Sequence, residues 1–251
     1  MNKIRLIARL DVKDQNLVKG IQLEGLRKLG NPNAFAKEYY ESGVDELLYI
    51  DIVASLYNRC NLSEIVRKTT EDVFIPITVT GGLRSVEDVR AILKMGADKT
   101  GINTAAIKRP ELISEVAEAF GSQCMVLSIE AKRTPAGNYE CYYDNGREHS
   151  GYDAVEWAAR GAELGAGEIL LTSVDRDGLR RGMDVDLIRQ VCGEVSVPVI
   201  CSGGASGAED IAAAAKAGAS AVAVGSILHY HNKSIPQLKS ELRALGIEVR
   251  A

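Results

Sequence analysis

The feature that most constrains this chain is an alternation of short, β-branched apolar runs with segments of helical periodicity, repeated eight times. Strict alternation of this kind predicts parallel strands joined by helical crossovers. Eight units in 251 residues give about 31 residues a unit, the size of a βα repeat. The predicted strands are Arg5–Asp11, Glu46–Asp51, Ile75–Thr80, Lys99–Ile102, Met125–Glu130, Ile169–Thr172, Val197–Ser202 and Ala221–Gly225.

The segments between these strands carry the start and stop signals of helices. Ser85 suits an N-cap, and Pro110 suits the first turn of a helix that Gly121 ends. Asp153–Leu164 and Gly207–Ala217 have the same pattern. We therefore predict an α/β fold, a closed (β/α)8 or TIM barrel. An open doubly wound sheet is the alternative, but no G-x-G-x-x-G motif follows the first strand.

The chain also repeats itself at about half its length. Residues 75–82, IPITVTGG, match residues 197–204, VPVICSGG, at an offset of 122. Leu10–Lys13 matches Ile129–Lys132 at an offset of 119. We predict one domain over residues 1–251, built from similar half-barrels of about 1–121 and 122–251. A half-barrel alone would leave open sheet edges, so the halves are not expected to be separate domains.

Charge and composition argue against several classes of protein. The net charge is −4, from 30 basic and 34 acidic residues without a basic block, so we expect no nucleic-acid partner. No apolar run approaches the ~20 residues of a membrane span, and the N-terminus lacks a signal peptide. We expect a cytoplasmic protein with reduced thiols, no metal and no cofactor. Its five scattered cysteines are Cys60, Cys124, Cys141, Cys192 and Cys201.

In a barrel of this kind, chemistry belongs at the carboxyl ends of the strands. Glycine pairs end the third and seventh predicted strands, where backbone N–H groups can approach an anion without a Cβ in the way. Two such cradles suggest a substrate with a phosphate at each end, whereas the alternative is a pair of ordinary turns. One cradle comprises Gly203, Gly204, Gly225 and Ser226, and the other Gly81, Gly82, Asn103 and Thr104.

Two acids end opposite predicted strands, the first and the fifth. Asp11 and Glu130 could divide acid and base work if their surroundings separate their pKa values. The alternative is a pair of solvated carboxylates beside nearby lysines. The long first loop, Val12–Gly30, is of the kind that covers such sites, and its Lys19 and Arg27 could meet a phosphate.

Several motifs together resemble the cyclase subunits of imidazole glycerol phosphate synthase. The resemblance covers nearly the whole chain, and the related isomerases share the half-barrel repeat but not the Phe-Gly-Ser-Gln segment. The motifs are Leu10-Asp11-Val12-Lys13, Val18-Lys19-Gly20, residues 81–88 (GGLRSVED), residues 102–106 (INTAA), Phe120-Gly121-Ser122-Gln123-Cys124, residues 165–173 (GAGEILLTS) and Asp175-Arg176-Asp177-Gly178.

This resemblance implies a cyclase that receives ammonia from a glutaminase subunit, with which it forms a heterodimer. Ammonia would enter the N-terminal face, pass through the barrel and reach a bisphosphorylated aminoimidazole carboxamide ribonucleotide. Cyclisation and lyase cleavage would yield imidazole glycerol phosphate and AICAR. The resemblance implies an acid/base role for Asp11, substrate contacts for Lys19, Asp177 and Gly178, and phosphate sites at both cradles. It implies an ammonia entrance of Arg5, Glu46, Lys99 and Glu168.

The chain departs from the family pattern at the active face. Glu130 stands where the family has aspartate, and Arg9, Thr80 and Leu179 replace the usual cysteine, glycine and threonine. Similar departures mark paralogues found with polysaccharide genes, which are thought to deliver ammonia for amidination of a sugar acetamido group. That function is the alternative. A non-catalytic activator of a glutaminase is a third possibility, and the two cradles argue against it.

Overall fold

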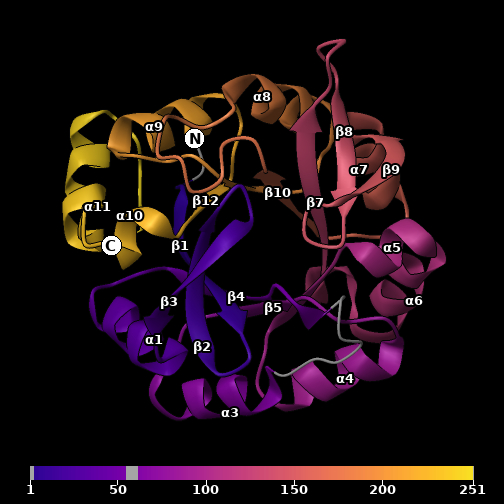
Figure 1. Ribbon diagram of the computed structural model, residues 1–251, viewed down its shortest axis with the longest axis horizontal. Coiled ribbons are helices and arrows are strands. Elements are labelled where there is room, and N and C mark those ends of the chain that lie inside the picture. Colours follow the sequence, from indigo (N-terminus) through magenta and orange to yellow (C-terminus); the bar gives the residue numbers. More distant parts are fainter. Residues whose placement is uncertain (1–2, 55–61, 251) are drawn as a thin grey trace.

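The computed structural model describes residues 3–54 and 62–250, so Cys60 lies outside the described residues. Eight parallel strands of this part close into a barrel, with helices around it (Figure 1). The predicted (β/α)8 fold is confirmed. The pairing of β12 with β1 and of β7 with β10 closes the ring. In order round the barrel, the strands are β1 (Arg5–Lys13), β4 (Glu46–Asp51), β5 (Ile77–Thr80), β6 (Lys99–Ile102), β7 (Met125–Arg133), β10 (Glu168–Ser173), β11 (Val199–Ser202) and β12 (Ala221–Val224).

The helices begin close to the predicted signals. Ser85 caps α4 in a capping box with Asp88, and Asp153 caps α7. Pro110 is the N-cap of α6 and not a residue of its first turn. Across the described residues, we find no helix with the length and apolarity needed to span a bilayer. The helices are α1 (Pro32–Glu41), α3 (Ser63–Asp72), α4 (Val86–Lys94), α5 (Thr104–Lys108), α6 (Glu111–Phe120), α7 (Ala154–Glu163), α8 (Val185–Glu194), α9 (Ala208–Lys216), α10 (Ser226–His229) and α11 (Ile235–Ala244), with a 3-10 turn at Ser122–Cys124.

Two strands are shorter than predicted at their beginnings. β5 starts at Ile77 and β11 at Val199, two residues later than expected in each case. Pro76 and Pro198 precede these starts, and a proline has no N–H to donate to a neighbouring strand. Their carbonyl groups still accept hydrogen bonds from the adjacent strands, Pro76 from the Leu47 N–H and Pro198 from the Ile169 N–H. Each proline therefore pairs with the neighbouring strand on one side only.

Side chains alternate along each barrel strand between the interior and the helical layer. On β1, Leu6, Ala8 and Leu10 pack under the helices, whereas Ile7 packs inside the barrel. Arg9 and Asp11 follow Ile7 at intervals of two, so they project into the same interior nearer the mouth. The interior apolar layer is formed by Ile7, Leu48, Val126, Leu170, Ile200, Ala221 and Ala223.

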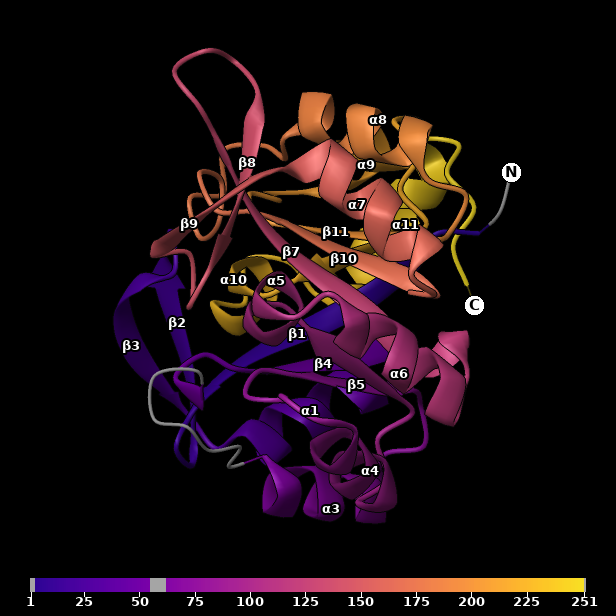
Figure 2. The same cartoon turned by 90° about the vertical axis from the view of Figure 1, so that its right-hand side faces the viewer.

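Two antiparallel hairpins rise from the carboxyl end of the barrel, opposite the end where Ile4 pairs with Val249 (Figure 2). The first is β2 (Asn16–Ile21) with β3 (Glu24–Gly30), and it continues β1. The second is β8 (Tyr139–Tyr143) with β9 (Glu148–Asp153), and it continues β7. Residues 12–30, expected as a long loop, are therefore mostly strand, because β2 pairs with both β1 and β3.

Candidate active site

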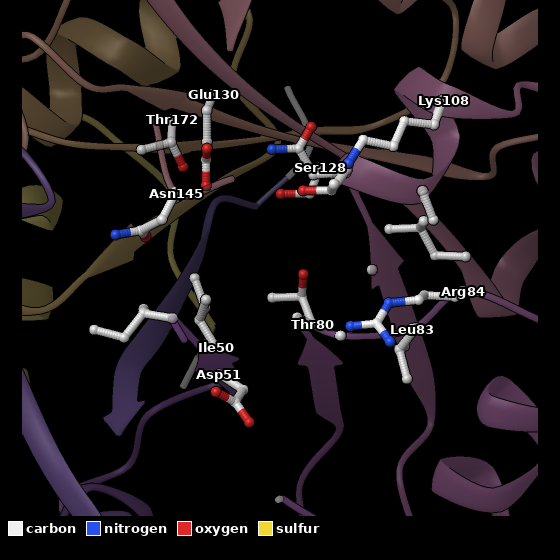
Figure 3. Close-up of a pocket in the computed structure, with 18 of the residues that line it drawn as sticks. Ile50, Asp51, Thr80, Leu83, Arg84, Lys108, Ser128, Glu130, Asn145 and Thr172 are labelled. Carbon is white, nitrogen blue, oxygen red and sulfur yellow. The ribbon is translucent and has the colours of Figure 1, made fainter. Parts of the chain in front are cut away.

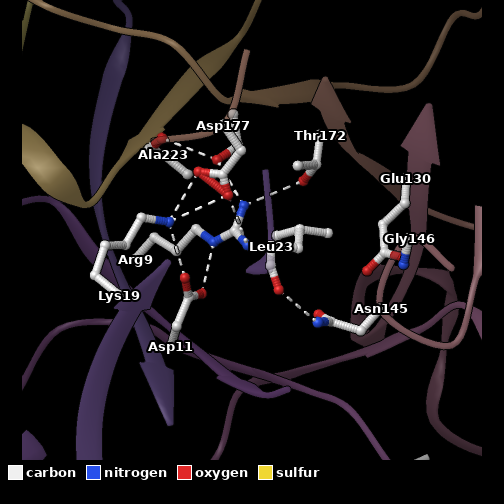
Figure 4. Close-up of polar contacts among 11 residues, drawn as sticks. Arg9, Asp11, Lys19, Leu23, Glu130, Asn145, Gly146, Thr172, Asp177 and Ala223 are labelled. Carbon is white, nitrogen blue, oxygen red and sulfur yellow. Dashed lines mark hydrogen bonds and ion pairs between the residues drawn. The ribbon is translucent and has the colours of Figure 1, made fainter. Parts of the chain in front are cut away.

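Asp11 and Glu130 lie on opposite sides of the barrel mouth. Asp11 is on β1 and Glu130 on β7, which stand four strands apart in the ring of eight. Figure 4 shows Asp11 within a group of charged side chains, while Glu130 stands apart beside Gly146. The two carboxyl groups thus occupy different surroundings, as a division of acid and base work requires.

The carboxylate of Asp11 is enclosed by two cations. Arg9 Nε donates to Oδ1 at 2.8 Å, and Lys19 Nζ donates to Oδ2 at 2.9 Å. Lys19 Nζ also donates to Asp177 Oδ1 at 2.8 Å. All four side chains are buried. Strands β1 and β2 and the loop after β10 therefore meet in one closed cluster of two acids and two bases (Figure 4).

This cluster keeps Asp11 ionised. Burial alone would raise the pKa of the Asp11 carboxyl, but the charges of Arg9 and Lys19 outweigh burial and hold that pKa well below its ordinary value. Each oxygen already accepts a charge-assisted hydrogen bond. At neutral pH Asp11 is consequently a carboxylate and has no proton to supply.

Glu130 has the opposite character. Its Oε2 accepts a hydrogen bond from the Gly146 N–H at 2.7 Å, from the turn between β8 and β9. Burial raises the pKa of Glu130 to about 7, and the Gly146 hydrogen bond and the charge of Arg9 only partly oppose it. A carboxyl group with this pKa is protonated in about half of the molecules at neutral pH, so it can donate a proton.

The raised pKa of Glu130 predicts a pH-dependent cost in stability. A carboxyl whose pKa is higher in the folded than in the unfolded state stabilises the fold fully at low pH, and that contribution is lost as pH rises from about 4.5 to 7. Glu130→Gln should therefore raise the free energy of unfolding relative to wild type by about 3 kcal/mol more at pH 8 than at pH 4.5. Urea denaturation measures this, with the exposed Glu148→Gln as control. Equal effects of Glu130→Gln at both pH values would contradict the assignment.

A cavity of about 360 Å³ opens beside Glu130 (Figure 3). Its wall includes Glu130, Thr172 and Ser128 on one side and the first predicted cradle, Gly81, Gly82, Asn103 and Thr104, on the other. Four cations, Arg9, Arg84, Lys108 and Arg109, also line it. Asp11 is not among the lining residues. The cavity thus joins a proton-donating carboxyl to an anion-attracting end.

Asn103 and Thr104 also hold the second hairpin in place. Asn103 Nδ2 donates to the carbonyl of Tyr142 at 3.2 Å, and Thr104 Oγ1 accepts from the Asp144 N–H at 3.1 Å. The same hairpin brings the Gly146 N–H to Glu130. The first cradle and the catalytic candidate are therefore coupled through β8 and β9.

The second predicted cradle surrounds a smaller cavity of about 20 Å³. Gly204 has a φ of +94°, and a Cβ there would lie 2.2 Å from the carbonyl oxygen of Gly182. Only glycine fits this position. The substitution Gly204→Val would therefore disturb the loop itself, whatever its effect on anions. The predicted residues brought together around this cavity are Lys19, Asp177, Gly178, Gly203, Gly204, Gly225 and Ser226.

Hydrogen bonds from Gln22 attach the first hairpin to the loop after β10, which contributes Asp177 to the lining of this smaller cavity. The Gln22 N–H donates to the carbonyl of Asp177 at 2.9 Å, and Gln22 Nε2 donates to the carbonyl of Asp175 at 3.1 Å. Lys19 points inward and is buried, whereas its cross-strand partner Arg27 is exposed. Of the two cations expected in this segment, the structure brings only Lys19 to the mouth.

The four residues assigned to the ammonia entrance form a closed ring of ion pairs at the opposite end of the barrel. Arg5 contacts Glu46 at 2.7 Å and Glu168 at 2.5 Å. Lys99 contacts Glu46 at 3.3 Å and Glu168 at 2.8 Å. Each is the first residue of its strand, so the ring lies directly beneath the apolar interior layer.

The two neighbouring histidines of the sequence do not converge. His229 is buried, and its Nδ1 lies 2.7 Å from Tyr39 Oη. The His231 side chain is 69% exposed and faces Glu38. In the part of the chain that the structure describes, no group of three or more His, Cys, Asp or Glu side chains is placed to hold a metal ion.

Sequence reasoning missed five residues that contribute to the mouth. Arg9 appeared only as a departure from a family pattern, although its spacing of two from Asp11 already placed both inside the barrel. Gly146 belongs to a hairpin that was not predicted. Arg84, Lys108 and Arg109 lie outside the quoted cradle residues, and their charge beside a glycine turn was the available signal.

The chain matches a known protein family and is similar in sequence to several known proteins. The family described as histidine biosynthesis protein matches residues 5–234. An imidazole glycerol phosphate synthase subunit HisF from Legionella pneumophila is 62% identical over 81% of this chain and 96% of its own length. Proteins of the same name from Mycobacteroides abscessus and Streptomyces coelicolor are 48% and 50% identical, each over 98% of both chains.

Proposed function

The chain belongs to the histidine biosynthesis protein family, and from that membership and the geometry of its mouth we propose that it is the HisF-type cyclase of imidazole glycerol phosphate synthase. It is a lyase of histidine biosynthesis. It combines ammonia with a bisphosphorylated aminoimidazole carboxamide ribonucleotide and forms imidazole glycerol phosphate and AICAR. The observation that carries this proposal is the pair of glycine cradles at opposite sides of a mouth that also holds two unlike carboxyl groups.

The distribution of cations supports a substrate with two phosphates. Arg84, Lys108 and Arg109 lie around the first cradle, and Lys19 and Arg180 lie beside the second. Arg9 lines the cavities of both. The larger cavity, about 360 Å³, lies within the usual size of a small-molecule site. We assign one phosphate to each cradle, with the reacting part of the substrate between them and beside Glu130.

The separated pKa values of the two acids support a division of their roles. Incorporation of ammonia, ring closure and cleavage require one group that accepts protons and another that donates them. Asp11 begins as a carboxylate and accepts, while Glu130, with a pKa of about 7, donates. We assign the donor role to Glu130 in the cavity wall and the acceptor role to Asp11 in the charged cluster.

A glutaminase partner, the HisH type, supplies the ammonia at the other end of the barrel. The ring of Arg5, Glu46, Lys99 and Glu168 surrounds the barrel axis there, and the small and apolar interior layer lies between it and the mouth. Neutral ammonia crosses such a layer more readily than ammonium, because burying an unpaired charge is costly. The four ion pairs close the ring and must separate for ammonia to pass.

Exposed apolar side chains support docking at this same end. Phe74, Met95 and Leu245 precede strands or the terminal bridge at the amino end, and their exposed fractions are 77%, 37% and 39%. Large apolar residues exposed on one face are typical of a protein interface. We therefore place the glutaminase over Phe74 and the ion-pair ring.

This placement predicts the effect of one substitution. Phe74→Asp should weaken the complex with a HisH-type glutaminase by at least about tenfold, because it puts a charge into an apolar contact. Isothermal titration of the two purified subunits measures the affinity. Ile21→Asp is the matched control, since Ile21 is also exposed but lies on the first hairpin at the opposite end. Equal losses in both variants would contradict the placement.

The decisive test of the function needs no partner. A spectrophotometric cyclase assay with a saturating ammonium salt should show turnover of the histidine-pathway ribonucleotide by the native chain. The departures at Arg9, Thr80, Glu130 and Leu179 favour the alternative acceptor, an acetamido sugar, only if this turnover is negligible while phosphate binding is intact. Robust turnover would exclude the sugar-directed function as the main one.

A further inference from the structure

Arg9 divides the mouth of the barrel. Its side chain lines the larger cavity of about 360 Å³ and also the smaller cavity of about 20 Å³. The first cradle opens into the larger cavity and the second into the smaller one. A ligand with one phosphate in each cradle must therefore pass the guanidinium group of Arg9 (Figure 4).

Two of the three guanidinium nitrogens are fixed by the protein. Nε donates to Asp11 Oδ1 at 2.8 Å. Nη1 donates to Ser202 Oγ at 3.1 Å and to Thr172 Oγ1 at 3.4 Å. Ser202 Oγ in turn donates to the carbonyl of Ala223 at 3.1 Å, which fixes its orientation as an acceptor. Because a guanidinium is planar, these contacts also determine where the third nitrogen points.

The third nitrogen, Nη2, is held less closely than the other two. Nη2 lies 3.7 Å from Asp177 Oδ2, which is an ion pair but too long for a hydrogen bond. It donates no hydrogen bond to any residue in the ranges 3–54 and 62–250. Asp177 lines the smaller cavity and not the larger one. The two N–H groups of Nη2 are therefore on the side of the second cradle.

The second cradle is narrow. Its cavity of about 20 Å³ is much smaller than the cavity of about 360 Å³ beside the first cradle. Four charged side chains line it, Arg9, Lys19, Asp177 and Arg180, and Lys19 pairs with Asp177 at 2.8 Å. An entering phosphate competes with Asp177 for Lys19 and Arg9. Asp177 lies 3.7 Å from Arg9 Nη2 but 2.8 Å from Lys19 Nζ, so its ion pair with Arg9 is the weaker one and the easier to exchange.

We propose that Arg9 is a substrate-binding residue, whose Nη2 donates to an oxygen of the phosphate group held at Gly203-Gly204 and Gly225-Ser226. The proposal rests on the function proposed above, because it takes the substrate to carry two phosphates. Arg9 then acts on specificity. A ligand without an anion at this end leaves the buried N–H groups of Nη2 without an acceptor, and is disfavoured for that reason.

Phosphate binding tests this role directly. Titration calorimetry with inorganic phosphate should show two classes of site in the native protein, one for each cradle. Arg9→Gln and Arg9→Lys should each weaken one class by roughly ten- to a hundredfold, the value of a hydrogen bond to a charged group. Arg84→Gln is the matched control, because Arg84 lines only the larger cavity and should weaken the other class.

Arg9→Lys separates binding from charge neutralisation. A lysine at this position can still pair with Asp11, but its single nitrogen cannot also provide the second donor at the cradle. If Arg9 served only to neutralise Asp11, Arg9→Lys would keep native phosphate affinity, and the proposal would be overturned. Should Arg9→Gln fail to fold, Arg9→Gln with Asp11→Asn keeps the local charge balanced, and phosphate titration of that variant gives the same comparison.

Kinetics then distinguish this proposal from the proposed function. In the ammonia-dependent assay, Arg9→Lys should raise the KM for the bisphosphorylated substrate by a factor similar to the loss of phosphate affinity. A native protein without turnover but with phosphate affinity that depends on Arg9 would refute the function and keep the role of Arg9. Turnover with a KM and a phosphate affinity insensitive to Arg9 would refute that role and keep the function.

Discussion

Asp11→Asn is expected to lower ammonia-dependent formation of imidazole glycerol phosphate by about a thousandfold. An amide cannot accept a proton, so the variant loses the group that begins the reaction as a carboxylate. It also removes the negative charge to which Arg9 Nε and Lys19 Nζ donate. The initial rate with a saturating ammonium salt measures the loss without a partner subunit.

The control must show that this loss is chemical. Asp72→Asn removes a carboxylate that pairs with Lys37 on the exterior, where both side chains are at least half exposed, and should leave the rate unchanged. Thermal unfolding of Asp11→Asn establishes that the fold persists with Asp177 as the acid that remains beside two cations. Turnover of Asp11→Asn within tenfold of wild type would remove Asp11 from the list of reacting groups.

The barrel could be predicted because its signals are local and repeated. Each βα unit is indicated locally, by strand periodicity and by N-caps such as Ser85 and Asp153. The match between residues 75–82 and 197–204 indicates that such a unit is repeated. The positions of the two acids followed from the same rule, since each ends a predicted strand and parallel strands end on one face. In the structure β1 and β7 continue two and three residues beyond these acids, into the hairpins.

The hairpins could not be predicted in the same way. β3 is largely exposed, with charged residues on both faces, so it lacks the alternation that identifies a half-buried strand. It forms because β2 continues β1 and offers it a partner, with Leu17 opposite Gly30 and Ile21 opposite Glu24. A strand that is stabilised by pairing more than by burial leaves little trace in a hydrophobicity pattern.

The charged cluster shows where sequence reasoning ends. The alternation along β1 puts Arg9 and Asp11 in the interior, but their partners Lys19 and Asp177 come from a hairpin and a loop 158 residues apart. Whether buried ions pair or repel depends on distances that no local pattern contains. The structure adds to the expectation for Asp11 that two cations hold its carboxyl group ionised.

Glu130→Gln is expected to lower ammonia-dependent turnover by at least about a hundredfold, whereas Glu130→Asp should stay within about tenfold of wild type. Glutamine keeps the length and can still accept the Gly146 N–H, but it cannot donate an acidic proton. Aspartate keeps that proton, although its carboxyl is one methylene shorter and draws back from Gly146. The contrast between these two variants separates the need for an acid from the need for a fixed position.

The pH profile identifies which proton is involved. Since Glu130 acts as the donor, the active form is protonated, and turnover should fall as pH rises through about 7. The measurement keeps the concentration of free ammonia constant by adjusting total ammonium at each pH. The fall in turnover above about pH 7 then depends on ionisation of the enzyme and the substrate alone. The residual rate of Glu130→Gln should no longer show the fall with rising pH that ionisation of Glu130 causes. Any fall caused by ionisation of the substrate phosphates should remain in all variants. An identical fall in wild type and Glu130→Gln would assign the proton to another group and leave Glu130 as a residue that only binds.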